Sequence, residues 1–151
     1  MIIDPYCRIA LHSKMDLIHA TSISISSKGV LIRGASGMGK SDLAFRLMNL
    51  GATLISDDYT NVAVAKDKVI LSPPNNIEGK IELRGIGIVT VPFKTKCALK
   101  LIIDLVKPNY IPRLPDQNLI EFEGHKIPSY QFSSFETSTP EKIHFLLKSI
   151  E

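Results

Sequence analysis

The feature that most constrains the fold of this sequence is a glycine-rich segment between an apolar run and an amphipathic stretch. It matches the pattern G-x-x-x-x-G-K-S in full, and its residues are Gly34, Ala35, Ser36, Gly37, Met38, Gly39, Lys40 and Ser41. The glycines allow successive backbone N–H groups to converge on phosphate oxygens. Lys40 can reach the β- and γ-phosphates, and the Ser41 hydroxyl can occupy one position around Mg²⁺. The pattern therefore indicates binding of a nucleoside triphosphate together with magnesium.

The flanking residues predict a strand before this loop and a helix after it. Residues 30–32 form a short apolar run, typical of a strand covered on both faces. Leu43, Leu47 and Leu50 then recur at helical spacing, and Gly51 stands where a left-handed turn ends a helix. A glycine turn that merely joins two elements is the alternative, and the order of strand, loop and helix favours nucleotide binding.

The remaining pattern is rich in strands and closes on a helix. Residues 21–26 alternate apolar and polar, which predicts a strand with one buried face, and Lys28–Gly29 is expected to turn the chain. Ser138 is placed to cap a last helix whose apolar face contains Ile143 and Leu147. Further strands are expected at 54–56, 61–65, 69–71, 86–91, 98–106, 119–122 and 127–132, although 98–106 also fits a helix.

The composition predicts a single globular domain over residues 1–151. A net charge of +3, from 18 Lys and Arg against 15 Asp and Glu, is too small to indicate a nucleic-acid partner. Cys7 and Cys97 lie far apart, so neither a disulfide framework nor a zinc site is expected. Residues 1–6 do not resemble a signal peptide, and no apolar run approaches the roughly 18 residues of a membrane span. A cytoplasmic protein is therefore expected.

Two adjacent carboxylates follow the expected strand at 54–56. Asp57 and Asp58 lie 16 and 17 residues after Ser41, where a strand packed beside the loop strand would carry them to the phosphate side of the sheet. In a kinase, one carboxylate can act as a base on the substrate hydroxyl while another binds magnesium. The pattern leaves open which aspartate does which, and a solvated turn is the alternative interpretation.

Two further features are ambiguous from their pattern alone. His19 has no partner that its spacing identifies, and a lone histidine is more often structural than catalytic. In residues 81–88, Glu82 and Arg84 fall on one side of an extended segment, and two glycines permit a bend or a close approach. An edge strand with a surface ion pair is the simpler interpretation of that segment.

Taken together, these residues resemble HPr kinase/phosphorylase, a family of bifunctional bacterial enzymes that act on a serine of the phosphocarrier protein HPr. The similarity spans about positions 19 to 91 and includes His19, the loop 34–41, the paired aspartates and the stretch 81–89, which looks like the family signature. The fold that this implies is an α/β P-loop kinase domain of the HPr kinase C-terminal, PEP carboxykinase-like type, with a central mixed sheet and flanking helices.

The resemblance also implies an activity: a serine protein kinase that uses ATP and Mg²⁺ on an HPr-like carrier protein and that forms a homo-oligomer, a hexamer in the family. Asp58, or its neighbour Asp57, would be the base towards the serine hydroxyl, and Lys40 would stabilise the transferring phosphoryl group. The residues implied as catalytic are His19, Lys40, Asp57, Asp58 and Arg113, and those implied as magnesium ligands are Ser41 and Glu82.

The sequence departs from the family pattern in two places. Only about 18 residues precede His19, where family members commonly carry an additional domain, so a short form with the catalytic domain alone is expected. Residues 135–141 are acidic and hydroxyl-rich where the family tends to have a basic loop linked to phosphorolysis of the phosphoserine. We therefore expect the kinase direction to be retained and the reverse reaction to be weak or lost.

Two other classes of function share the phosphate loop. A small-molecule kinase of the nucleoside or shikimate type would need an arginine-rich lid, for which only Arg84 and Arg113 are candidates after the loop. A nucleotide-binding switch would bind ATP without transferring phosphate to a hydroxyl, and replacing Asp57 and Asp58 would leave its activity unchanged.

Overall fold

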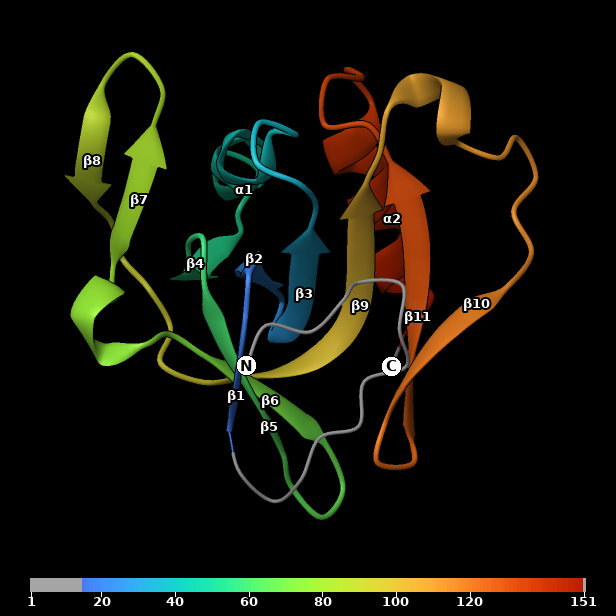
Figure 1. The fold of residues 1–151 in the computed structure, drawn as a ribbon, viewed down its shortest axis with the longest axis horizontal. Helices are drawn as coiled ribbons and strands as arrows, with labels where there is room; N and C mark the ends of the chain where they lie inside the picture. Colours follow the sequence, from blue (N-terminus) through green and yellow to red (C-terminus); the bar gives the residue numbers. More distant parts are fainter. Residues whose placement is uncertain (1–14, 151) are drawn as a thin grey trace.

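The computed structural model describes residues 15–150, so the expectations about Cys7 and about residues 1–6 lie outside the described part. Figure 1 shows a curved sheet, with one helix near the top of the view and the other behind the strands. The elements, in chain order, are β1 (Asp16–Ile18), β2 (Ala20–Ile25), β3 (Lys28–Arg33), α1 (Lys40–Met48), β4 (Thr53–Ser56), β5 (Thr60–Val64), β6 (Val69–Ser72), β7 (Lys80–Leu83), β8 (Gly87–Thr90), β9 (Cys97–Leu105), β10 (Asn118–Phe122), β11 (His125–Phe132) and α2 (Thr139–Lys148).

Most of these strands form one mixed sheet. Its main path runs β1-β5-β6-β9-β3-β2-β4, and β11 joins it on β9 while β10 joins β11. Strands β3 and β11 both pair with β9 in parallel, and the remaining pairs of this sheet are antiparallel. Strands β7 and β8 form a separate hairpin. The expected central mixed sheet is confirmed.

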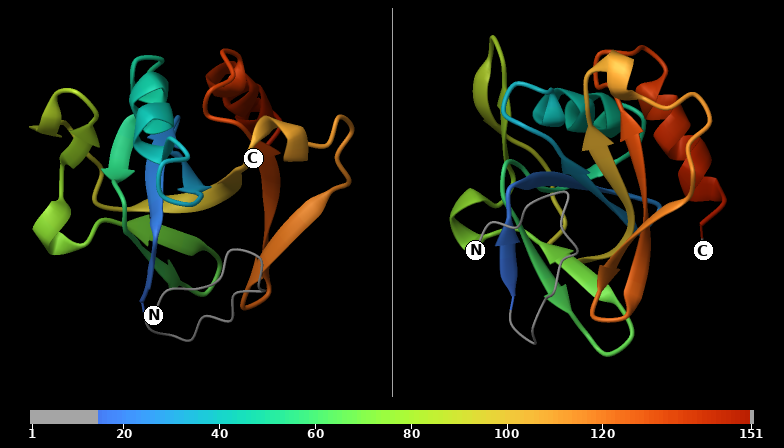
Figure 2. Two further views of the ribbon diagram at one scale, coloured as in Figure 1. Left: turned by 45° about the horizontal axis from the view of Figure 1, so that its top comes forward. Right: turned by 45° about the vertical axis from the view of Figure 1, so that its right-hand side comes forward.

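Both helices pack on the same face of the sheet (Figure 2). Leu43 and Leu47 of α1 and Ile143 of α2 belong to one apolar core, the helix-side core, with inward residues of β2, β3 and β9. The opposite face curves over a second core formed by strands alone, which includes Leu31 and Phe122. The expected apolar face of α2 is therefore confirmed.

A bulge in β9 interrupts the alternation of its side chains between the two cores. Gly29 pairs with Leu99 but the next residue, Val30, pairs with Leu101, so Lys100 is the extra residue. As a result Leu99 points into the strand-only core and Leu101 into the helix-side core, although they are two residues apart. A Cβ on Gly29 would lie 2.6 Å from the Ala98 carbonyl oxygen, so only glycine fits beside the bulge.

Two expectations about the first hairpin are wrong. The turn between β2 and β3 uses Ser26 and Ser27, with φ of 50° and 65°, whereas Lys28 and Gly29 already belong to β3. Strand β2 is buried on both faces, because Ile23 and Ile25 pack in the helix-side core and Ala20 packs in the strand-only core. Its serines are satisfied there: Ser22 Oγ lies 2.9 Å from Thr60 Oγ1.

The other predicted elements are found within a residue or two. The strand interpretation of 98–106 and the hairpins at 61–71 and 119–132 are confirmed. Helix α1 ends as expected, since Gly51 has a φ of 103° and the next amide, that of Ala52, donates to the Leu47 carbonyl. Ser138 precedes α2 but its hydroxyl makes no capping bond, so that detail is wrong. No helix in residues 15–150 is both long and apolar enough to cross a membrane.

Candidate active site

The loop between β3 and α1 has the backbone of a phosphate-binding turn. Gly37 and Gly39 have φ values of 86° and 89°, which side chains with a Cβ rarely adopt. The Met38 amide donates to the Ala35 carbonyl at 3.1 Å, which closes the turn. Helix α1 begins directly afterwards at Lys40, so its free amides and positive dipole end face the loop. The loop and helix are suited to hold an anion.

Residues 133–136, between β11 and α2, support the back of this loop. Ser134 donates from its hydroxyl to the Met38 carbonyl at 2.6 Å. A Cβ on Gly39 would lie only 2.1 Å from the Ser134 oxygen, so Gly39 is required for this close approach as well as for its φ. Arg46 of α1 donates to the carbonyls of Ser134 and Glu136. No local sequence pattern indicates this support, because it joins residues 88 to 96 positions apart.

Lys40 is buried and held by the loop itself. Its Nζ donates to the Gly34 carbonyl at 2.8 Å and to the Ala35 carbonyl at 3.4 Å. Burial lowers the pKa of Lys40 below its ordinary value, and the nearby charges of Asp58 and Asp57 oppose that shift. The ammonium is therefore incompletely compensated, which favours its interaction with a polyphosphate.

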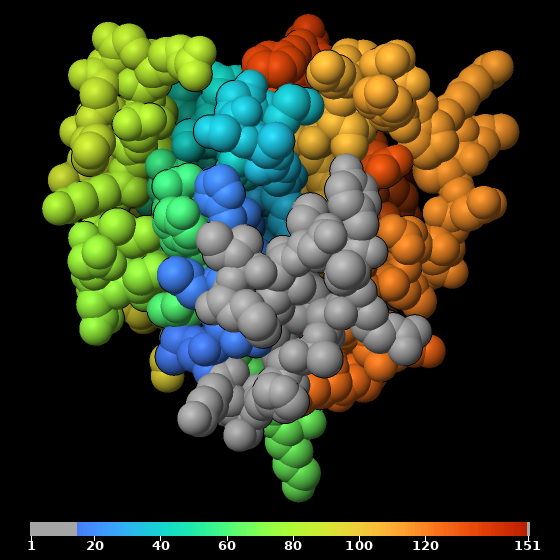
Figure 3. Space-filling model, in the orientation of Figure 1, coloured from blue at the N-terminus to red at the C-terminus, as the bar shows by residue number. Residues whose placement is uncertain are grey.

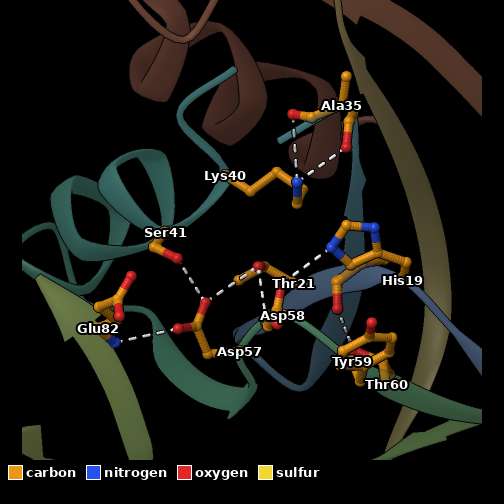
Figure 4. Close-up of polar contacts among 12 residues, drawn as sticks. His19, Thr21, Ala35, Lys40, Ser41, Asp57, Asp58, Tyr59, Thr60 and Glu82 are labelled. Atoms are coloured by element: carbon orange, nitrogen blue, oxygen red, sulfur yellow. Dashed lines mark hydrogen bonds and ion pairs between the residues drawn. The ribbon is translucent and has the colours of Figure 1, made fainter. Parts of the chain in front are cut away.

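Asp57 is buried and its carboxylate accepts three hydrogen bonds (Figure 4). Oδ1 accepts from the Ser41 hydroxyl at 2.6 Å and from the Thr21 hydroxyl at 3.1 Å. Oδ2 accepts from the backbone amide of Glu82 at 3.0 Å. The carboxylate thus lies directly against the phosphate loop, as the spacing predicted.

Asp58 points elsewhere because the chain turns sharply at this residue. Its φ is 68°, in the left-handed region, and the Tyr59 amide donates to the Asp57 carbonyl at 2.7 Å across it. Such a tight turn is strained for a residue with a side chain. The Asp58 side chain is 62% exposed, and its Oδ1 lies 2.9 Å from Nε2 of His19. The structure therefore supplies the partner of His19 that spacing alone did not identify.

Thr21 connects the two aspartates and was missed in the sequence. Its buried hydroxyl donates to Asp57 Oδ1 and accepts from the Asp58 amide at 3.2 Å. One side chain therefore fixes both the carboxylate of the first aspartate and the backbone of the second. Its position two residues after His19 on β2 was the available signal, but the register of β2 against β4 cannot be read from sequence.

The strands bring the aspartates to the loop by a different path from the expected one. β4 was expected to pack beside the loop strand β3, but β2 lies between them and is antiparallel to both. Strands β3 and β4 consequently run in the same direction, and their carboxyl ends meet at one edge of the sheet. The aspartates reach the phosphate side as predicted, although through an intervening strand.

Glu82 belongs to the β7–β8 hairpin rather than to a single edge strand. Its backbone amide donates to the Asp57 carboxylate, and its side chain is exposed. No ion pair joins Glu82 to Arg84 in the described part of the chain. In Figure 4 the Glu82 carboxylate lies on the same side of Asp57 as the Ser41 hydroxyl. Within residues 15–150, no group of three or more His, Cys, Asp or Glu side chains is placed to hold a metal by itself.

Arg113 lies away from the aspartates. It is exposed in the segment between β9 and β10, where it lines a groove of about 520 Å³ along β11. Among the described residues it makes no hydrogen bond or ion pair with Lys40, Asp57 or Asp58. The structure therefore brings together His19, Lys40, Ser41, Asp57, Asp58 and the backbone of Glu82, but not Arg113.

Comparisons with known proteins agree on one family. Residues 11–133 match the model of the HPr Serine kinase C-terminal domain. An HPr kinase/phosphorylase of Mycoplasmopsis pulmonis is 33% identical over 122 residues, which are 78% of this chain and 39% of that protein. The Hpr(Ser) kinase/phosphatase of Coxiella burnetii superimposes with a TM-score of 0.78 and 28% identity, over 89% of each chain. The chain therefore belongs to the HPr kinase family, whose C-terminal domain it matches.

Proposed function

We propose that this domain transfers the γ-phosphate of ATP to a serine hydroxyl of an HPr-like carrier protein. The observation that carries the proposal is the division between two adjacent aspartates: Asp57 is buried against Ser41, whereas Asp58 is exposed beside His19. The two positions suit two different tasks in phosphoryl transfer, metal binding and proton removal. The names of the M. pulmonis and C. burnetii relatives support the same substrate.

The donor set around Asp57 fits magnesium. Ser41 Oγ and Asp57 Oδ1 lie 2.6 Å apart, so two oxygen donors already converge beside the loop. Mg²⁺ prefers oxygen ligands and keeps several waters, so one or two protein ligands with phosphate oxygens suffice. We assign these two residues as ligands, and the Glu82 carboxylate as a further one. The ion supplies neutralisation of the charge that develops on the phosphates.

Lys40 and the loop amides bind the phosphates. The Lys40 ammonium donates to the carbonyls of Gly34 and Ala35 in this structure. To bind a nucleotide it has to exchange at least one of these neutral acceptors for a phosphate oxygen. A charged acceptor makes a hydrogen bond about twice as strong as a neutral one, so this exchange is favourable. The positive end of α1 adds to the same attraction.

Asp58 is the group that we assign as base. Its exposure leaves the carboxylate accessible to a hydroxyl carried on another protein, whereas Asp57 is closed off. The Asp58 carboxylate takes the proton of the attacking serine hydroxyl, and the His19 ring orients that carboxylate through the 2.9 Å contact. Because residues 135–141 are acidic and hydroxyl-rich where the family tends to have a basic loop, we propose that phosphorolysis is weak in this chain.

Other properties of the family complete the proposal. The resemblance supports a homo-oligomer, a hexamer, which light scattering of the purified protein tests. It also supports a cytoplasmic location, where carrier proteins of the HPr type would be met. We further assign residues 1–151 to one catalytic domain and Arg113 to a contact with the bound nucleotide or the carrier.

The test is transfer of labelled γ-phosphate from ATP, with Mg²⁺, to a purified HPr carrier, alongside Lys40→Ala. Label on a carrier serine with the unaltered protein alone supports the proposal. Bound ATP without label on the carrier would indicate a small-molecule kinase or a nucleotide switch instead. The reverse reaction is tested by adding inorganic phosphate in excess to the phosphoserine carrier, where rapid release would contradict the weak phosphorolysis.

A further inference from the structure

The groove beside β11 is unused by the residues that bind phosphate. Its volume is about 520 Å³, and it lies between the segment that joins β9 to β10 and the start of α2. Figure 3 shows that segment, in light orange, projecting from the body of the molecule. Its lining includes the side chains of Arg113, Asn118, Tyr130, Gln131, Phe132 and Lys142.

The groove lies on the opposite side of the loop strand from the aspartates. The strand order β4-β2-β3-β9, with β11 after β9, places Asp57 on one side of β3 and the groove beyond β9. Because paired strands lie about 4.8 Å apart, the outer edge of β11 is about 10–15 Å from β3. A phosphate chain whose terminal group faces the aspartates therefore extends towards β9 and β11.

Hydrogen bonds join the groove to the phosphate loop. Ser129, which lines the groove, donates to Asp104, and Asp104 pairs with Arg33 immediately before the loop. Glu136, which also lines the groove, accepts at its carbonyl from Arg46 of α1. The walls of the groove are thus positioned by the same residues that position the loop.

The chemistry of the groove suits a flat heterocycle on a sugar. The rings of Tyr130 and Phe132 lie nearly parallel, 7° apart, with centroids 6.3 Å apart, and offer apolar faces. The amides of Asn118 and Gln131 can donate and accept. In the described chain, β11 pairs with β10 only as far as Ser129, so residues 130–132 also have an outer backbone edge that no strand covers. Arg113 and Lys142 add positive charge and Asp116 and Glu136 negative charge, and Lys142 Nζ lies 3.3 Å from Glu136 and 6.0 Å from the centroid of the Phe132 ring.

We propose that this groove is the nucleoside subsite, which holds the base and ribose of the nucleotide whose phosphates lie in the loop. The inference rests on the proposed function, since it needs a nucleoside triphosphate as phosphate donor. Open α/β sheets bind ligands at the carboxyl ends of their strands, and both the loop and the groove lie at that edge. ATP then binds more tightly than an inorganic polyphosphate, because its nucleoside makes additional contacts in the groove.

The test compares MgATP with magnesium tripolyphosphate by calorimetry. The unaltered protein binds ATP more tightly than tripolyphosphate. Tyr130→Leu, which keeps an apolar side chain, and Asn118→Trp, which fills the exposed mouth, weaken ATP binding about tenfold, the scale of one base–aromatic contact. Neither variant changes binding of tripolyphosphate. Tyr110→Leu is the matched control, because Tyr110 is exposed in the same segment but does not line the groove.

The outcomes separate this inference from the proposed function. Equal affinity of the unaltered protein for the two ligands, or ATP affinity unchanged in both groove variants, would overturn the subsite alone. Parallel loss of both ligands in a groove variant with an unchanged melting temperature would also contradict it. Failure of the unaltered protein to bind either ligand would overturn the proposed function and, with it, the subsite.

Discussion

The Ser41 hydroxyl donates a 2.6 Å hydrogen bond to Oδ1 of Asp57, and this contact joins the first turn of α1 to the end of β4. Helix α1 directly follows the phosphate loop, whereas β4 is separated from the loop strand β3 by β2. The contact places two oxygen donors for a cation beside the loop. The left-handed backbone of the next residue, Asp58, turns its side chain away, so the two adjacent carboxylates lie in different environments.

Asp57→Asn is expected to change the magnesium requirement. The amide keeps an oxygen for Ser41 and Thr21 but loses the charge that attracts the cation, so the Mg²⁺ concentration for half-maximal transfer rises at least about tenfold. Titration of transfer with MgCl₂ measures this. Asp67→Asn, which removes a charge in the β5–β6 turn, is the control, and an equal magnesium curve for both variants would exclude Asp57 as a ligand.

Thr21→Val is expected to uncouple the two aspartates. Valine keeps the shape but leaves the Asp58 amide without its acceptor and the buried Asp57 carboxylate with one donor fewer, which costs about 1–3 kcal/mol of stability. Thr21→Ser keeps the hydroxyl, so it recovers most of the lost stability and most of the turnover. Urea unfolding and the transfer rate measure both effects. A serine variant no better than the valine variant would contradict the bridging role.

Gly39→Ala is expected to be more harmful than Gly51→Ala. Both glycines have positive φ, so each substitution costs about 1–2 kcal/mol in backbone strain. At Gly39 the new Cβ would also meet the Ser134 oxygen at 2.1 Å, whereas at Gly51 no atom lies within 4 Å. Only Gly39→Ala should therefore displace residues 133–136 and abolish ATP binding. Comparable ATP affinity in the two variants would show that this contact is unimportant.

The pH dependence of ATP binding is expected to report Lys40. Only the protonated amine attracts phosphate, and burial lowers its pKa, so affinity falls as pH rises and begins to fall below the ordinary lysine value of 10.5. Asp58→Asn removes a charge that raises this pKa, so the decline moves to lower pH. Calorimetry across the alkaline range measures the shift. Lys40→Arg stays charged and gives a flat profile, and a flat profile for the unaltered protein would contradict the assignment.

Local sequence patterns predicted the parts of the site that lie close together in the chain. The loop at 34–41, the helix after it and the aspartates at the end of β4 each depend on a short periodic segment or a fixed spacing, and all are found. The turn at Ser26–Ser27 was misplaced because glycine is the usual turn residue and Gly29 follows two positions later. In the structure Gly29 instead makes room for the β9 bulge.

Contacts between segments that are distant in the chain could not be predicted from the sequence. Thr21, Ser134 and the backbone amide of Glu82 act through pairings between strands and through a close approach of two loops, which no local pattern encodes. The partner of His19 was missed for the same reason, since the register of β2 against β4 decides it. The position of β2 between β3 and β4 likewise depends on strand order.

The most direct test of the account is the rate at which labelled γ-phosphate reaches the serine of an HPr carrier at saturating ATP and Mg²⁺. Asn tolerates the left-handed backbone at position 58, so Asp58→Asn removes the base without adding strain. We predict that its transfer rate falls about 10²–10⁴-fold while its ATP affinity at neutral pH is retained. A carrier serine that stays unlabelled with the unaltered protein, or that Asp58→Asn labels at the unaltered rate, would contradict the account.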